Sequence, residues 1–247
     1  MQFLIFLSNH HLFLQNNLNN LATLLIIDTA GEKAMVGISQ NKELLAMEQN
    51  EVANTHASFV QVAIEKVITK AQIKLSEIDA IVVTMGPGSY TGLRVGLASA
   101  KGIAYAISKP LIGLSTLTLL SNAAKSTHSY TEQGQNLQIF AMIDARRMEV
   151  FGAILNKQQQ HILQEQSIVL DTQYLETLLV QGPVLCVGSG VEKTKALLQH
   201  PQLFFTERVY SLEDCMELAN AKWDTQIFEN IAYSSPSYLK DFYQKPV

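Results

Sequence analysis

The order of predicted strands and helices repeats along the chain, and this repeat limits the fold more than any other feature. The first half is predicted to contain strands at 24–27, 34–38, 44–47, 81–84 and 111–113 and helices at 56–70, 91–107 and 115–124. The second half is predicted to contain strands at 138–143, 149–155, 167–170 and 184–187 and helices at 173–180 and 192–198. Asp28 and Asp144 end the first strand of each half. The sequence therefore predicts an internal duplication.

A duplicated βββαβα unit is typical of the actin, hexokinase and Hsp70 (ASKHA) architecture, in which two lobes enclose a cleft. We therefore predict a two-lobed α/β fold. The expected parts are an extension outside the fold at 1–22, an N-terminal lobe at 23–125, a C-terminal lobe at 126–211, a closing helix at 212–233 and an extended tail at 234–247. The first 22 residues lack the basic start and cleavage site of a signal peptide, so an upstream start codon is the preferred explanation.

The composition is that of a globular protein, with 47% hydrophobic and 16% charged residues among 247. The net charge of −4 argues against a chain that binds nucleic acid by itself, because phosphate neutralisation needs clustered Lys and Arg. Cys186 and Cys215 have neither metal nor redox-motif spacing, so a reducing cytoplasm is expected. No stretch reaches the length of a membrane span.

The segment from Met85 to Ala106, MGPGSYTGLRVGLASAKGIAYA, predicts a strand end, a tight turn and a helix. Gly86 and Gly88 flank Pro87 and are free to adopt positive φ. Ser89 or Thr91 could cap the helix. We interpret Gly86, Pro87 and Gly88 as a structural turn.

The helix that follows this turn carries little bulk on one side. Gly96 and Gly102 each cost about 1 kcal/mol of helix propensity relative to Ala. Close backbone packing is therefore expected on the side that carries Gly92, Gly96 and Gly102. The opposite side, with Arg94 and Lys101, predicts a second and partly polar contact.

Other segments could carry chemistry, but each has a structural explanation. The hairpin at 28–31 is a candidate phosphate nest, although an Asp that ends a strand is more often a turn former. The turn at 86–92 is not a P-loop, because Leu93 and Arg94 stand where Lys and Ser or Thr are required. The turn at 188–190 suits an adenosine contact or a plain strand-to-helix connection. The six histidines lack metal-site spacing.

Several segments together resemble the TsaB family, also called YeaZ, between about Leu24 and Pro246. They are Leu25–Ala30, Asn54–Ser58, Gly86–Gly96, Asp144–Arg146 with Glu149–Phe151, and Pro236–Lys240. Residues 1–22 have no counterpart in the family pattern.

The resemblance implies a non-catalytic, cytoplasmic partner of the transferase TsaD. TsaD moves a threonylcarbamoyl group from threonylcarbamoyl-AMP, which TsaC supplies, onto adenosine 37 of tRNAs that read ANN codons (t6A37). The ATPase TsaE joins the complex. The resemblance implies no cofactor in this chain, with ATP and metal on partner subunits, and tRNA contact only through the complex. TsaD has a metal-binding His pair where this chain has Ser115 and Leu119, so the metal site of the transferase is expected to be missing.

The family's heterodimer is built from the first two helices of each N-terminal lobe, here about 56–70 and 91–107. The interface residues predicted from this resemblance are His56, Phe59, Val60, Ala63, Val67, Thr91, Arg94, Val95, Ala98 and Gly102. Gly86, Pro87, Gly88, Gly92 and Gly96 are assigned to the structural turn and its packing. Two alternatives stay open: an enzyme of the same fold, either a small-molecule kinase or a glycopeptidase, and a homodimer that uses the same helices.

Overall fold

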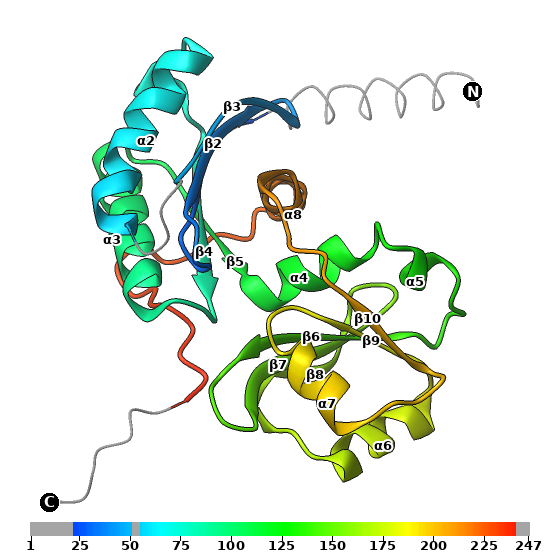
Figure 1. The fold of residues 1–247 in the computed structure, drawn as a ribbon. Helices are drawn as coiled ribbons and strands as arrows, with labels where there is room; N and C mark the ends of the chain where they lie inside the picture. The colour runs from blue at the N-terminus through cyan, green and yellow to red at the C-terminus, as the bar shows by residue number, and fades with distance from the viewer. Residues whose placement is uncertain (1–21, 51–54, 241–247) are drawn as a thin grey trace, which may run out of the picture.

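The computed structural model of the chain describes residues 22–50 and 55–240, which form two lobes with the same topology (Figure 1). The N-terminal sheet has the strand order β3-β2-β1-β4-β5, and the C-terminal sheet has the order β8-β7-β6-β9-β10. In each lobe the central strand pairs antiparallel with the next strand and parallel with the fourth. The strands are β1 (Thr23–Asp28), β2 (Met35–Gln40), β3 (Glu43–Gln49), β4 (Ala80–Gly86), β5 (Leu111–Ser115), β6 (Gln138–Asp144), β7 (Glu149–Asn156), β8 (His161–Val169), β9 (Val184–Val187) and β10 (Leu203–Thr206). The predicted duplication and the two-lobed ASKHA-like fold class are confirmed.

The helices form three layers around these sheets (Figure 1). They are α2 (His56–Ala71), α3 (Tyr90–Ala106), α4 (Thr116–Ala124), α5 (His128–Thr131), α6 (Thr172–Gln181), α7 (Val191–Leu197) and α8 (Leu212–Asp224), with a 3-10 turn at Leu75–Glu77. Helices α2 and α3 cover the outer face of the N-terminal sheet, and α6 and α7 cover that of the C-terminal sheet. Helices α4 and α8 lie between the sheets and contact each other, so both helices join the lobes.

Strand β1 shows why its sequence is a continuous apolar run. Leu24 and Ile26 point into the core between the lobes, whereas Leu25 and Ile27 point into the outer core beneath α2 and α3. A strand that is covered on both faces needs apolar residues at every position. The interlobe core joins the inner faces of both sheets with α4 and α8 in one apolar cluster.

The predicted closing helix over 212–233 is too long. Helix α8 ends at Asp224, because Gln226 adopts a left-handed conformation with φ of 55°. Beyond this turn the chain pairs with β5, where the Glu229 N–H donates to the Leu111 carbonyl at 2.8 Å. Strand β10 was not predicted from the sequence, because four residues are too few to show a period.

The ends of the chain agree only in part with the expected parts. Ala22, the last residue of the predicted extension, is buried, and residues 1–21 lie outside the described part. Residues 234–240 of the predicted tail contain neither helix nor strand, and 241–247 lie outside the described part. None of the helices in the described ranges is both long and apolar enough to cross a bilayer.

Candidate functional site

The glycine turn between β4 and α3 is seated against the hairpin that follows β1. Gly86 has a φ of +104°, which L side chains rarely adopt. An added Cβ at Gly88 would overlap the Ala30 carbonyl, and one at Gly92 would overlap the Thr29 carbonyl. The Ser89 N–H donates to the Ala30 carbonyl at 2.8 Å. The turn is thus packed directly on the candidate phosphate hairpin.

The two glycines after the first turn of α3, Gly96 and Gly102, have different surroundings. An added Cβ at Gly96 would overlap the Thr29 hydroxyl, as expected for close packing. Gly102 was expected to pack closely too, but an added Cβ there would meet no atom within 4 Å, and this residue is exposed. It lies near the C-terminal end of α3, on the side away from the sheet. Of the two cap candidates, Ser89 is the N-cap, accepting a bond from the Gly92 N–H at 3.2 Å.

The Asp28 carboxylate is engaged by the protein itself and is 1% exposed. It accepts hydrogen bonds from the Thr84 hydroxyl at 2.6 Å and the Ala30 N–H at 3.1 Å, and the Tyr210 side chain adds another. Burial raises the pKa of Asp28 above its ordinary value despite these bonds. Sequence reasoning missed Thr84 and Tyr210. The signal for Thr84 was its position as a lone polar residue in the apolar strand β4, because a buried hydroxyl group needs a hydrogen-bond partner.

Replacing Asp28 with Asn is expected to change the pH dependence of stability. The pKa of Asp28 in the folded protein lies above its ordinary value of 3.8. At a pH well below 3.8 the carboxyl group is protonated in both the folded and the unfolded protein, so it does not lower the free energy of unfolding. As the pH rises from there through the folded-state pKa, the unfolded state ionises first and wild-type stability falls. Asp28→Asn cannot ionise and should gain stability relative to wild type across this window. Urea unfolding of both proteins from about pH 3.5 to about pH 8 measures this, and a pH-independent difference would contradict it.

A cavity of about 1140 Å³ lies between the lobes. Many of its lining residues follow β1, β4 and β5 of one lobe and β6, β9 and β10 of the other, at the carboxyl ends where α/β folds bind ligands, and others come from β2, β3, β7 and α4. Its charged lining residues are mostly acidic: Asp28, Glu32, Asp144, Glu192, Glu207 and Glu213, against Lys33 and Arg208. The cavity therefore disfavours polyanions.

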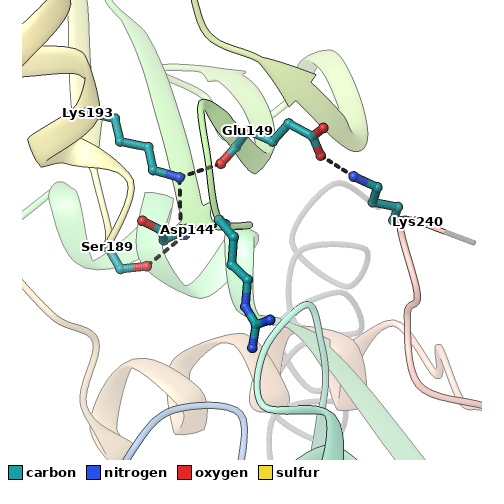
Figure 2. A network of polar contacts seen from close by, with 6 residues as sticks. Asp144, Glu149, Ser189, Lys193 and Lys240 are labelled. Carbon is teal, nitrogen blue, oxygen red and sulfur yellow. Dashed lines mark hydrogen bonds and ion pairs between the residues drawn. The ribbon is translucent and has the colours of Figure 1, made fainter. Parts of the chain in front are cut away.

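Asp144 lies at the position in the C-terminal lobe that corresponds to Asp28, and it belongs to a polar network at the edge of the cavity (Figure 2). Lys193 donates to the Asp144 carboxylate at 2.9 Å and to the Glu149 carbonyl at 2.8 Å. Partial burial opposes ionisation, but the bonds from Lys193 and the Arg146 N–H prevail and lower the pKa of Asp144. The Glu149 carboxylate pairs with Lys240, whose ammonium lowers the pKa of Glu149.

The turn at 188–190 has a structural role in this network. The Ser189 hydroxyl accepts a bond from the Asp144 N–H at 2.9 Å. Gly188 has a φ of +102°, and an added Cβ there would overlap the Met142 carbonyl. These contacts favour the strand-to-helix connection over an adenosine contact.

Ser115 and Leu119 both have structural partners. The Ser115 hydroxyl caps α4 by accepting from the Thr118 N–H at 3.2 Å, and it donates to Glu165 of the other lobe. Leu119 is fully buried in the interlobe core. Within residues 22–50 and 55–240, His, Cys, Asp and Glu side chains form no group of three or more that could hold a metal ion.

The structure corrects part of the interface predicted on α2. His56, Val60, Ala63 and Val67 are at most 4% exposed, because the apolar stripe of α2 packs on its own sheet. The His56 ring also hydrogen-bonds the Gly31 carbonyl at 3.0 Å. These four side chains therefore cannot form an outer contact surface. The other predicted interface residues are exposed or half-buried: Phe59, Thr91, Arg94, Val95, Ala98 and Gly102.

The outward side of the helix pair also contains residues that were not predicted. Val62 of α2 is 50% exposed, and Gln61 donates to the Ser99 hydroxyl of α3 at 2.8 Å. Val62 could have been recognised from the sequence, because it is an apolar residue on the side of α2 opposite the apolar stripe. Tyr90 and Tyr238 lie beside Arg94. The contact between Tyr238 and Arg94 had no signal in the sequence, because the two residues are 144 positions apart.

Comparison with known proteins places the chain in a family. Residues 48–241 match the family described as "TsaD: tRNA N6-adenosine threonylcarbamoyltransferase". The Haemophilus influenzae tRNA threonylcarbamoyladenosine biosynthesis protein TsaB is 35% identical over 130 residues, which cover 52% of each protein. The Escherichia coli protein of the same name is 26% identical over 225 residues, 88% of this chain and 94% of that protein. The chain belongs to the TsaB/YeaZ family. Solved YeaZ from Pseudomonas aeruginosa is 26% identical with a TM-score of 0.71, covering 88% of this chain and all of that one.

The sequence motifs that resemble the TsaB/YeaZ family lie close together in the fold. The chain spans about half of the Haemophilus influenzae relative and nearly all of the Escherichia coli relative. The glycine turn, Asp144 with Glu149, and the segment ending at Lys240 carried the resemblance in the sequence, and they are linked in the structure. Met85 accepts a bond from the Ser237 N–H at 2.7 Å, and Lys240 reaches Glu149.

Proposed function

We propose that this TsaB/YeaZ chain is a non-catalytic subunit that binds the transferase TsaD and activates it. In the complex, TsaD transfers the threonylcarbamoyl group of threonylcarbamoyl-AMP to adenosine 37 of tRNAs that read ANN codons. Family membership carries the proposal, since curated relatives are named for the biosynthesis of this nucleoside. The structural roles of Ser115 and Leu119 support the non-catalytic assignment, because neither side chain replaces a metal-bound imidazole.

The outward side of α2 and α3 is the proposed docking surface for TsaD. Thr91, Ala98 and Gly102 form an exposed row of small residues along α3, and Val62 lies on the outward side of α2. Small side chains allow the axes of partner helices to approach closely. A stable interface needs about 800 Å² from each partner, which two helices of four turns can largely provide.

The interlobe cavity supports a role in which nucleotide chemistry takes place on other subunits. The fold family implies a nucleotide phosphate site beside the first strand, but the acceptor oxygens of Asp28 are engaged by Thr84, Ala30 and Tyr210. The acidic lining also repels polyphosphate, so these residues do not fit the group. We therefore propose that ATP and metal bind to TsaD and TsaE. We also propose that tRNA contacts the chain only within the assembled cytoplasmic complex.

Reconstitution tests the proposed function directly. The purified chain, mixed with TsaD from the same organism, is expected to elute as a complex and to stimulate threonylcarbamoyl transfer to tRNA when TsaC and TsaE are present. No complex and no stimulation would overturn the proposal. ATP turnover or peptide cleavage by the isolated chain, abolished in Asp28→Ala, would favour an enzyme. Sedimentation without TsaD tests whether the same helices form a homodimer.

A further inference from the structure

Arg94 has an unusual environment at the start of α3. Its guanidinium carbon lies 4.0 Å from the centre of the Tyr90 ring and 5.8 Å from that of Tyr238. Its Nε donates to the Tyr238 hydroxyl at 2.9 Å. The two rings lie 5.5 Å apart. Arg94 thus packs over the Tyr90 ring and is hydrogen-bonded to Tyr238, on an exposed surface.

One of these rings comes from the chain after α8. We define residues 232–240 as the C-terminal strap, which runs beside α3 (Figure 1). Lys101 of α3 donates to the carbonyls of Ala232 and Ser234 at 3.3 and 3.0 Å. Beyond Tyr238, Lys240 pairs with Glu149 of the C-terminal lobe (Figure 2). The strap is therefore fixed to both lobes.

The geometry of α3 places the strap next to the proposed docking surface. At about 100° per residue, Arg94 and Lys101 lie on one side of the exposed row, and Ser99, which bonds α2, lies on the other. Ala98 is one turn beyond Arg94 and belongs to the row itself. The row is therefore flanked by α2 on one side and by Arg94 with the strap on the other.

Arg94 is charged and has no acidic partner in residues 22–50 and 55–240: all of the ion pairs found there involve other cations. The Tyr238 and Tyr90 side chains accept hydrogen bonds from Arg94. A guanidinium has five N–H donors, so donors remain for a carboxylate, which binds through two parallel N–H groups. Tyr90 and Tyr238 are 40% and 41% exposed, so this cluster is open to solvent. An arginine held in place by aromatic rings loses little freedom on binding, and Tyr and Arg are enriched among the residues that dominate interfaces.

We propose that the docking surface on α2 and α3 includes Arg94, which Tyr90 and, from the C-terminal strap, Tyr238 hold in place, and that Arg94 binds a carboxylate of the TsaD partner. This inference rests on the proposed function and names the contact that orients the complex. The neighbouring row residues Thr91, Ala98 and Gly102 are uncharged, and the Lys101 ammonium is bound to carbonyls of the strap, whereas a phosphate backbone requires clustered cations. The surroundings of Arg94 therefore favour a protein carboxylate over RNA.

Binding measurements with TsaD from the same organism test this inference. Arg94→Ala is expected to weaken the complex about 10- to 100-fold, as for a dominant interface residue. Tyr238→Ala is expected to weaken it less, and the double variant no more than Arg94→Ala alone, because the ring acts through the arginine. Wild-type binding should weaken with added salt more steeply than Arg94→Ala binding. Arg146→Ala removes the same charge from an exposed turn of the other lobe and should bind like wild type.

The outcomes separate this inference from the proposed function. If the wild-type chain does not bind TsaD, both are overturned. If wild type binds and Arg94→Ala binds equally well, the inference alone is overturned. If Arg94→Ala binds TsaD as wild type does but its complex captures less tRNA, Arg94 contacts RNA. That result would overturn the proposed contact with a carboxylate of TsaD. Thermal unfolding tests whether each variant is folded. If Arg94→Ala does not fold, Arg94→Lys replaces it in the test. Lysine keeps the charge but lacks the planar guanidinium, so Arg94→Lys should bind TsaD more weakly than wild type.

Discussion

Gly92→Ala is expected to destabilise the protein by about 3 kcal/mol, the upper end of the cost of overpacking. The added methyl group would overlap the Thr29 carbonyl, which is backbone and cannot rotate away. Relief would require the glycine turn to move off the hairpin, with loss of the bond between Ser89 and Ala30. For a chain of this length the melting temperature should fall by about 10 °C.

Gly102→Ala is the matched control in the same helix. Its added methyl group meets nothing within 4 Å, so the variant should gain about 1 kcal/mol of helix propensity. Urea and thermal unfolding of both variants give the comparison. Equal effects of the two substitutions would show that the contact between the turn and the hairpin does not explain the glycine at position 92.

Ala98→Arg is expected to weaken binding to TsaD by about 100-fold, or about 3 kcal/mol. Ala98 is exposed in the middle of the small-residue row of α3, between Arg94 and Gly102. A long charged side chain there would hold the partner helix away and would have to be desolvated at the interface. Folding should be unaffected, because the side chain points away from the sheet. Titration calorimetry or biolayer interferometry with TsaD measures the change.

The control for this variant is Ala221→Arg, which adds the same side chain at an exposed position of α8. We expect wild-type affinity for TsaD and wild-type stimulation of threonylcarbamoyl transfer. Wild-type affinity in Ala98→Arg would move the docking surface away from α3. A loss of affinity in both variants would indicate a general effect of added charge.

Much of the fold could be predicted because its signals are local. The apolar run of β1, the broad stripe of α2 and the glycines after β4 all specify structure within a few residues. The end of α8 could not be predicted, since apolar residues such as Ile227 and Phe228 continue after Asp224 while the chain turns to pair with β5. Strand β10 depends on its neighbour β9 for its existence.

The candidate site was less predictable, because it depends on which side of each helix is covered. The stripe of α2 was correctly predicted to be apolar, but it packs on its own sheet, so His56, Val60, Ala63 and Val67 cannot form the docking surface. Periodicity identifies a face but not the element that covers it. Gly102 shows the same limit, since a glycine in a helix is equally compatible with close packing and with open surface.

The sequence alone determined the duplicated order of strands and helices, the glycine turn that starts α3, and the family, because each is encoded by residues close together in the chain. Only the tertiary structure decided which partners Asp28 binds, which face of α2 is exposed, and that Tyr238 lies against Arg94. Those contacts join residues from distant segments. They depend on how the sheets, helices and strap pack together, which no local pattern records.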